Sequence, residues 1–279
     1  MNTRKLCAIA CLLGAFVAFG CKPSDSEDET TPEMAKSMLK LRGYEINEKG
    51  LFKAVAKEDV LGVSGFLNAG VDPNSKNEKG ETALTFAIDD NESDKIAKIL
   101  IRKANVSMPD DLGSSPLHLA VIRNKDKVFD LILEKNVDVN IAGSEGKVKK
   151  ITPLYAAVLK RRNDLVKKLL KKGADPNIED SEGSFPLIDA VFQKAANPET
   201  VKLLLENGAK INKKNPDGAS ALIYAASNQD ITPEVRQTIV KLLLDKGADK
   251  SIKAKDGHDA LYWAKKMKNA VVVEMLESE

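Results

Sequence analysis

The side chains best suited to catalysis or metal binding are few in this sequence and lie far apart. It has only two histidines, His118 in the segment SPLHLA and His258 in the segment KDGHDA. Catalysis and metal binding both need several such groups at fixed spacing, and no C-x-x-C, H-E-x-x-H, G-x-S-x-G or phosphate-cradling glycine loop occurs. The carboxylates are scattered through turns. The sequence therefore predicts no catalytic residue, no bound metal and no cofactor.

The cysteines point to export rather than to chemistry. Arg4 and Lys5 precede an uncharged apolar run of 14 residues, Leu6 to Phe19, which suits a signal peptide and is too short to span a bilayer. The run ends in AFGC, which resembles the lipobox of bacterial lipoproteins, where the cysteine is lipidated after cleavage. The resemblance implies a lipid anchor on Cys21. Ordinary signal-peptide cleavage nearby, with Cys21 left as a free thiol, is the alternative.

Residues 1–20 are therefore expected to be a signal peptide, and residues 21–32 a disordered acidic tether. The chain has 43 basic and 41 acidic side chains, and removal of a leader with two basic ones leaves 41 of each. A neutral exported chain gives no electrostatic reason to bind nucleic acid. We expect the protein to be anchored to the bacterial inner or outer membrane, facing the periplasm or the cell surface.

Beyond the tether, the sequence repeats itself at nearly constant spacing. Each copy contains an anchor leucine, and successive anchors are separated by 33, 33, 37, 33, 35 and 39 residues. A second motif, NAGVDPN in one copy and KKGADPN in another, closes most copies. Two motifs in constant phase indicate a chain built from one repeated structural unit. The anchor leucines are Leu51, Leu84, Leu117, Leu154, Leu187, Leu222 and Leu261.

The segment SPLHLA and the period near 33 residues resemble the ankyrin repeat, whose hallmark is T-P-L-H-x-A. The resemblance implies an all-α solenoid of helix-turn-helix units with β-hairpin-like connecting turns, which binds proteins without doing chemistry. We expect about seven units over residues 33–279. They comprise an N-terminal half-repeat at 33–47, repeats at about 48–78, 79–112, 113–148, 149–181, 182–216 and 217–255, and a C-terminal cap at 256–279.

Local signals in the copies agree with paired helices. A proline suits the first helical position in SPL, TPL and FPL, and a hydroxyl at the preceding N-cap position suits most copies. In DLVKKLLKKG, apolar and lysine pairs alternate at helical spacing, and Gly173 can end the helix with a positive φ. Before the first copy, Met34, Met38 and Leu41 are expected to form one apolar stripe. The expected N-caps are Thr82, Ser115, Thr152 and Ser220.

Residues that differ between the copies are the candidates for binding a partner. In ankyrin proteins the end of the first helix and the hairpin tips usually hold the partner, and the resemblance implies this role for particular positions here. Three of them, Ile122, Leu159 and Phe192, either form an exposed strip of contact residues or pack under the neighbouring hairpins. The first-helix candidates are Asp89, Asp90, Ile122, Arg123, Leu159, Lys160, Phe192 and Gln193.

An insertion lengthens one of the hairpins. It runs from Ala142 to Lys150 and places Lys147, Lys149 and Lys150 at the tip. These lysines either meet an acidic protein or anionic lipid head groups, or they only keep the surface soluble.

These patterns together predict a monomeric, membrane-tethered scaffold or adaptor that binds an unidentified partner protein through a concave groove. A periplasmic inhibitor or immunity protein that neutralises a toxin or enzyme is the alternative. A small enzyme is a third possibility, for which no residue argues.

Overall fold

The computed structural model describes residues 30–90, 94–145, 148–192, 194 and 196–278. The predicted signal peptide, Cys21 and most of the predicted tether lie outside these residues, and so do Lys147 and Gln193. Within them the chain forms helices and one two-stranded sheet. It divides into two compact units, an N-terminal unit that ends at Val137 and a C-terminal unit that begins at Asp138.

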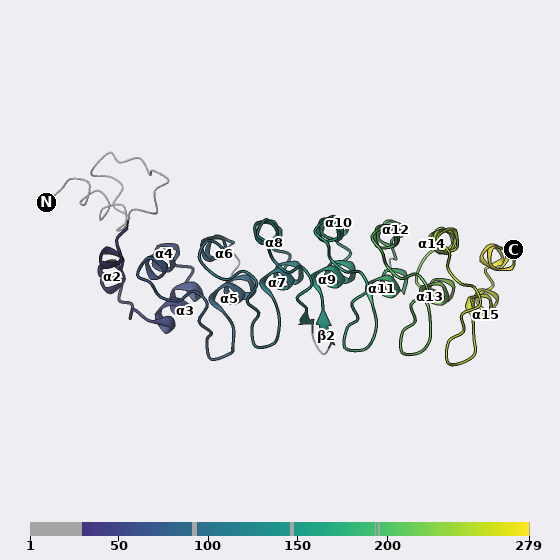
Figure 1. The fold of residues 1–279 in the computed structure, drawn as a ribbon, viewed down its shortest axis with the longest axis horizontal. Coiled ribbons are helices and arrows are strands. Elements are labelled where there is room, and N and C mark those ends of the chain that lie inside the picture. The colour runs from purple at the N-terminus through teal and green to yellow at the C-terminus, as the bar shows by residue number, and fades with distance from the viewer. Residues whose placement is uncertain (1–29, 91–93, 146–147, 193, 195, 279) are drawn as a thin grey trace. The chain divides into compact units, whose positions relative to one another are not determined.

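The N-terminal unit contains one single helix followed by helix pairs. Its described helices are α2 (Pro32–Leu41), α3 (Glu48–Ala56), α4 (Val60–Asn68), α5 (Ala83–Asp90), α6 (Lys95–Leu100), α7 (Pro116–Ile122) and α8 (Asp126–Leu133). The first helices of the pairs, α3, α5 and α7, pack against one another in chain order, and the second helices form a row against them. Long loops extend on the side away from the second helices (Figure 1).

The C-terminal unit begins with the hairpin and continues with helix pairs of the same kind. Its described elements are β1 (Gly143–Glu145), β2 (Val148–Ile151), α9 (Pro153–Leu159), α10 (Asn163–Lys171), α11 (Pro186–Phe192), α12 (Pro198–Glu206), α13 (Ala221–Ser227), α14 (Pro233–Asp245), α15 (Ala260–Lys266) and α16 (Ala270–Glu277). Here α9, α11, α13 and α15 form the row of first helices, and α10, α12, α14 and α16 form the row of second helices. The all-α repeat architecture expected from the sequence is thereby confirmed.

Hydroxyl caps begin the first helices at three of the four predicted positions. The side-chain oxygens of Ser115 and Thr152 accept the backbone N–H three residues later at 3.2 and 3.1 Å, and Thr82 does the same at 3.1 Å. Ser220 occupies the N-cap position of α13 as predicted, but its hydroxyl makes no cap hydrogen bond and is buried without a partner among the described residues. Its φ is −93°, against −74° at Ser115 and −71° at Thr152, a rotation that accompanies the loss of the bond.

The second helices bury one narrow stripe, as the pairs of leucines and lysines predicted. In α10, Leu165, Val166, Leu169 and Leu170 are at most 6% exposed, and the lysines between them face solvent. The helix ends before Gly173, whose φ is +85°, a conformation that glycine adopts without steric cost.

The buried stripe of α2 differs from the predicted one. Ala35, Met38 and Leu39 are buried, whereas Leu41 is 74% exposed. The reason lies in α4, which has Gly65 at the contact with α2. A Cβ at Gly65 would lie 2.4 Å from Met38 Cε and 3.2 Å from Leu39 Cδ2. The missing side chain therefore sets which face of α2 is buried, and Leu41 lies outside that face.

The asparagine that closes most copies links each repeat to the next. Its side-chain oxygen accepts a hydrogen bond from a backbone N–H in the closing motif of the following copy, and this satisfies a donor that the loop itself leaves open. The successive copies are thus joined by polar contacts as well as by apolar packing. The pairs are Asn74 with Asn105 at 2.6 Å, Asn140 with Asp175 at 2.9 Å, Asn177 with Lys210 at 2.7 Å, and Asn212 with Asp249 at 2.8 Å.

The difference between the caps gives a matched prediction. Thr152→Ala should lower the free energy of unfolding by about 1 kcal/mol, because the cap hydrogen bond is lost. Ser220→Ala should change it by less than about 0.5 kcal/mol, because its hydroxyl makes no bond. Urea denaturation followed by circular dichroism measures both. Thr152→Ser keeps the hydroxyl and serves as the control, and an equal cost for Ser220→Ala and Thr152→Ala would contradict the assignment.

Candidate functional site

Two of the predicted contact residues in the N-terminal unit bind each other. Arg123 follows α7, and its Nε lies 2.5 Å from Oδ1 of Asp89, near the end of α5. Both side chains remain partly exposed, so the pair is a surface salt bridge between neighbouring first helices. Ile122, the last residue of α7, is half-buried, and Asp90 is the last residue of α5. Asp89 and Arg123 therefore form one ion pair between neighbouring first helices instead of two separate charges.

The equivalent positions in the C-terminal unit differ in exposure. Leu159 at the end of α9 is half-buried and Lys160 is exposed, whereas Phe192 at the end of α11 is 52% exposed. The Phe192 ring packs edge-on against Tyr224 of α13, with ring centroids 5.1 Å apart and planes at 77°. Of the three apolar positions, Ile122 and Leu159 are thus half-buried and Phe192 is exposed. Phe192 is the member of the set that stands out into solvent.

The inserted hairpin is a true pair of strands. β1 and β2 pair in antiparallel fashion, with Ser144 opposite Lys149. Lys149 and Lys150 are exposed and lie on β2, so they belong to the strand and not to the tip between the strands. The backbone of Lys149 exchanges two hydrogen bonds with Ser181 of the following loop, each 2.9 Å long. These bonds fix the hairpin to the next repeat.

A second set of positions, which the sequence reasoning did not single out, lies two residues after each anchor leucine. In the described chain it includes Phe86, Asp189, Tyr224 and Trp263, all half-buried. In the C-terminal unit these side chains contact the loop that precedes their own helix: Asp189 bonds to Ser184, Tyr224 to Asn215, and the Trp263 ring packs edge-on against His258. A signal in the sequence could have found them: the anchor Leu and the Ala three residues later are the same in every copy, whereas the residue type at this position between them changes from copy to copy.

Asp189 is the centre of a polar cluster between α9, α11 and the loop before α11. Tyr155, which is only 2% exposed, donates its hydroxyl to Asp189 and also lies 3.1 Å from Asp180 Oδ2. Ser184 donates its hydroxyl to Asp189 at 3.0 Å. Asp180 in turn accepts the backbone N–H of Glu182 at 2.8 Å and that of Ser184 at 3.0 Å. The cluster therefore fixes the loop against two successive first helices.

Burial raises the pKa of both titratable groups at the centre of this cluster. It raises the pKa of Asp189, against the opposing effect of the hydroxyl hydrogen bonds from Tyr155 and Ser184. Burial also raises the pKa of Tyr155, and the negative charge of Asp189 adds to the rise. A tyrosine held in its neutral form by two nearby carboxylates is an inefficient proton donor or acceptor near neutral pH. The arrangement is therefore suited to positioning the loop.

Two further members of this set of positions, Tyr224 and Trp263, line a cavity of about 340 Å³ beside α13 and α15. Its lining residues also include Asp217 and Asp256 in successive loops. Asn215 donates to the Tyr224 hydroxyl at 2.9 Å, which holds that ring against its loop. Burial raises the pKa of Tyr224, so the hydroxyl remains a neutral hydrogen-bonding group.

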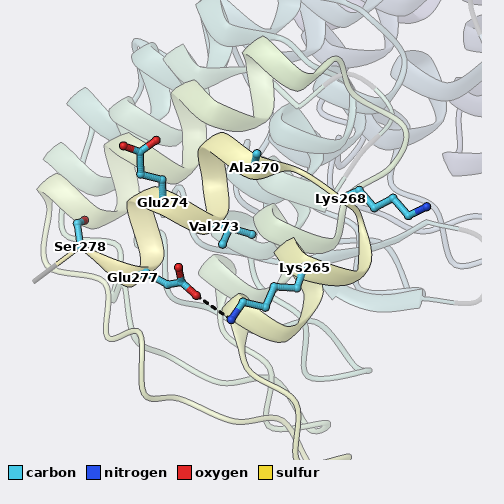
Figure 2. A pocket seen from close by; sticks show the side chains of 7 residues that line it. All are labelled: Lys265, Lys268, Ala270, Val273, Glu274, Glu277 and Ser278. Atoms are coloured by element: carbon cyan, nitrogen blue, oxygen red, sulfur yellow. Dashed lines mark ion pairs between the residues drawn. The ribbon is translucent and has the colours of Figure 1, made fainter.

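A larger and shallower cavity, of about 630 Å³, lies against the last helix pair (Figure 2). Lys265 of α15 points toward Glu277 of α16, and the two form an ion pair with an N–O distance of 2.7 Å. Lys268 extends away from that pair, and Glu274 lies in the middle of α16, also away from it. Two lysines and two glutamates line this cavity, so its charges balance and indicate no particular ligand.

The histidines have packing roles in the structure. His118 is 0% exposed within α7, and His258 stacks on Tyr262 with ring centroids 3.6 Å apart. Within the described ranges, no group of three or more histidine, cysteine, aspartate or glutamate side chains is placed to hold a metal ion. None of the helices in the described part of the chain has both the length and the apolar character needed to span a bilayer.

Comparisons with known proteins identify the repeats. The family model for ankyrin repeats (3 copies) matches residues 51–143, 141–215 and 187–279. A Rickettsia felis protein named for its ankyrin repeats is 31% identical over 96 residues, which are 34% of this chain and 32% of that protein. A Treponema pallidum protein named as containing ankyrin repeats is 30% identical over 115 residues, or 41% of this chain and 39% of that protein. The matches thus span about a third of the length of these relatives.

A solved structure agrees with the fold over most of the described chain. The ankyrin repeat domain of Bcl-3, a member of the IkappaB protein family, matches with a TM-score of 0.65 and 25% identity. The match covers 82% of this chain and 97% of that domain.

The raised pKa of Asp189 gives a pH-dependent prediction. Because the folded state favours the protonated carboxyl, Asp189 stabilises the fold below its unfolded pKa of about 3.9, and this contribution is lost as the pH rises through its folded pKa. Asp189→Asn keeps the acceptor for Tyr155 without the charge. It should therefore gain about 1 kcal/mol of stability relative to the parent between pH 4 and pH 7.

Urea denaturation at both pH values measures this difference. Asp245→Asn, which removes an exposed carboxylate from α14, is the control for the loss of one charge. A relative stability of Asp189→Asn that falls from pH 4 to pH 7 would show that the ionised carboxylate supports the fold, contrary to this assignment.

Proposed function

Because the chain belongs to the ankyrin-repeat family, whose repeats form protein–protein interaction domains, we propose that it is a scaffold or adaptor that binds a partner protein. The binding surface is the loop side of the first helices in the C-terminal unit. Phe192, Tyr224 and Trp263 lie there on helices whose loops are fixed by hydrogen bonds. A surface that is already ordered loses little conformational entropy on association.

The observation that carries the proposal is the exposure of Phe192. Aromatic side chains supply much of the binding energy at protein interfaces, and Phe192 is 52% exposed although its neighbours in α11 are buried. Its edge-on contact with Tyr224 holds the ring in place, so the ring offers apolar area that only a partner would cover. In the preceding helix pair, Leu159 corresponds to Phe192, and the exposed Lys160 that follows it adds a polar residue at the edge of this surface.

The proposal includes export and a lipid anchor on Cys21. Its support is the leader itself, with Arg4 and Lys5 before an apolar run of 14 residues that ends in AFGC. The acidic segment after Cys21 would separate the repeat domain from the bilayer. In this arrangement the scaffold holds its partner near the periplasmic or outer surface of a bacterial membrane.

Crosslinking in membranes, followed by recovery of the full chain, tests the interaction function. Phe192→Ser should lower the recovery of a specific partner about tenfold, because an interface aromatic residue contributes more than about 1.4 kcal/mol. Val271→Ser is the matched control, since Val271 is also exposed, at 42%, but lies on α16 in the row of second helices. Equal recovery with both variants would show that the partner does not use this surface.

Cell fractionation tests the anchor. Cys21→Ser should move the protein from the membrane fraction to the soluble fraction or leave it as an uncleaved precursor, because the lipid-bearing thiol is gone. Cys11→Ser, within the expected leader, should leave processing and membrane attachment unchanged. A Cys21→Ser protein that is processed and still membrane-bound would contradict the lipid anchor.

A further inference from the structure

The cavity beside α13 and α15 has a composition that favours one kind of side chain. Its volume of about 340 Å³ lies at the lower end of the range of ligand pockets, so it suits a single long side chain. Two aromatic residues, Tyr224 and Trp263, and two acidic residues, Asp217 and Asp256, line it together with Lys255. Two negative groups against one positive group give the cavity a net negative charge.

The loops that carry the two aspartates pack directly on each other. Asp217 and Asp256 each precede a glycine with positive φ, Gly218 at +78° and Gly257 at +82°. The backbone N–H of Lys255 donates to the carbonyl oxygen of Asp217 at 2.8 Å. A Cβ at Gly218 would lie 3.3 Å from the same nitrogen. The two loops that carry Asp217 and Asp256 therefore contact each other through their backbones.

The two carboxylates differ in their partners. Asp256 Oδ2 lies 3.0 Å from Nδ1 of His258. Among the residues that the structure describes, no lysine, arginine or histidine lies within ion-pair distance of the Asp217 carboxylate. Asp217 is thus the group in the cavity that an incoming cation would neutralise.

The aromatic wall also attracts cations. Lys266 already places its Nζ 4.6 Å from the centroid of the Trp263 ring, within the range of a cation–π interaction. Tyr262 packs edge-on against Trp263, with centroids 5.6 Å apart, and holds the indole in position. The Tyr224 ring is fixed by the hydrogen bond from Asn215. Both rings are therefore presented as rigid surfaces.

We infer that this cavity is a binding site for an arginine side chain of the partner protein. A planar guanidinium stacks on aromatic rings and pairs with a carboxylate in two-pronged fashion. An apolar side chain would remove Asp217 from water without a counter-charge, which is unfavourable. A glutamate would add a third negative charge. The inference rests on the proposed interaction function and specifies which chemistry of partner that function selects.

Trp263 is the only tryptophan in the chain, so its fluorescence reports on this cavity directly. The purified full chain is titrated with a blocked pentapeptide in which two glycines flank a central arginine on each side. Matched peptides carry leucine or glutamate at the centre. The arginine peptide should give a saturable change in Trp263 emission and bind about tenfold more tightly than either of the others.

Two variants locate the response. Asp217→Asn should weaken the arginine peptide at least about threefold, because the counter-charge is lost while the turn is kept. Asp245→Asn removes the same charge from α14, outside the cavity, and should leave the affinity unchanged. The inference is overturned if the arginine peptide gives no response, if the leucine peptide binds as tightly, or if the two variants behave alike.

The peptide assay needs no natural partner. Its failure would therefore remove the arginine site and leave the interaction function of the Phe192 surface intact. Failure of the crosslinking experiment would instead show that the partner does not use the Phe192 surface, whatever the peptides do.

Discussion

The stacking of one helix pair on the next is the contact on which this structure depends, because a single pair cannot bury its apolar face alone. The anchor leucines Leu154, Leu187 and Leu222 are at most 1% exposed, and each lies in a first helix that contacts its neighbours in the row. With 5% aromatic residues, the chain builds its core mainly from aliphatic side chains and close helix contacts. Each repeat therefore depends on packing against its neighbour for its stability.

Polar contacts fix the loops against the neighbouring repeats, which the apolar packing of the helices does not do by itself. The closing asparagines bind the backbone of the following copy, as Asn177 does at Lys210, and Asp189 joins α11 to Tyr155 of the preceding repeat. Such contacts have a cost, since burial raises the pKa of Asp189 and an ionised carboxylate is unfavourable there. What they give is a set of loops whose side chains keep fixed positions. A surface of that kind suits binding, because partners meet it already ordered.

The surface chemistry of the C-terminal unit is divided between its two sides. The second helix α10 presents exposed lysines, such as Lys168 and Lys171, whereas the loop side presents Phe192, Tyr224, Trp263 and the carboxylates of the cavity. A partner that recognised the lysines and a partner that recognised the rings would approach from different directions. The exposed ring of Phe192 and the preformed cavity are the features that favour the loop side.

The sequence by itself determined the period, the helix pairs, three of the four caps, the glycine stop after α10 and the family. These features depend on contacts between residues no more than four positions apart, or on the same motif returning at each copy, and both can be read along the chain. Only the tertiary structure decided that Asp89 pairs with Arg123, that Leu41 is exposed, and that Tyr155 meets Asp189. Those contacts join side chains about one repeat apart, or depend on a neighbour such as Gly65, so they follow from how one repeat sits on the next.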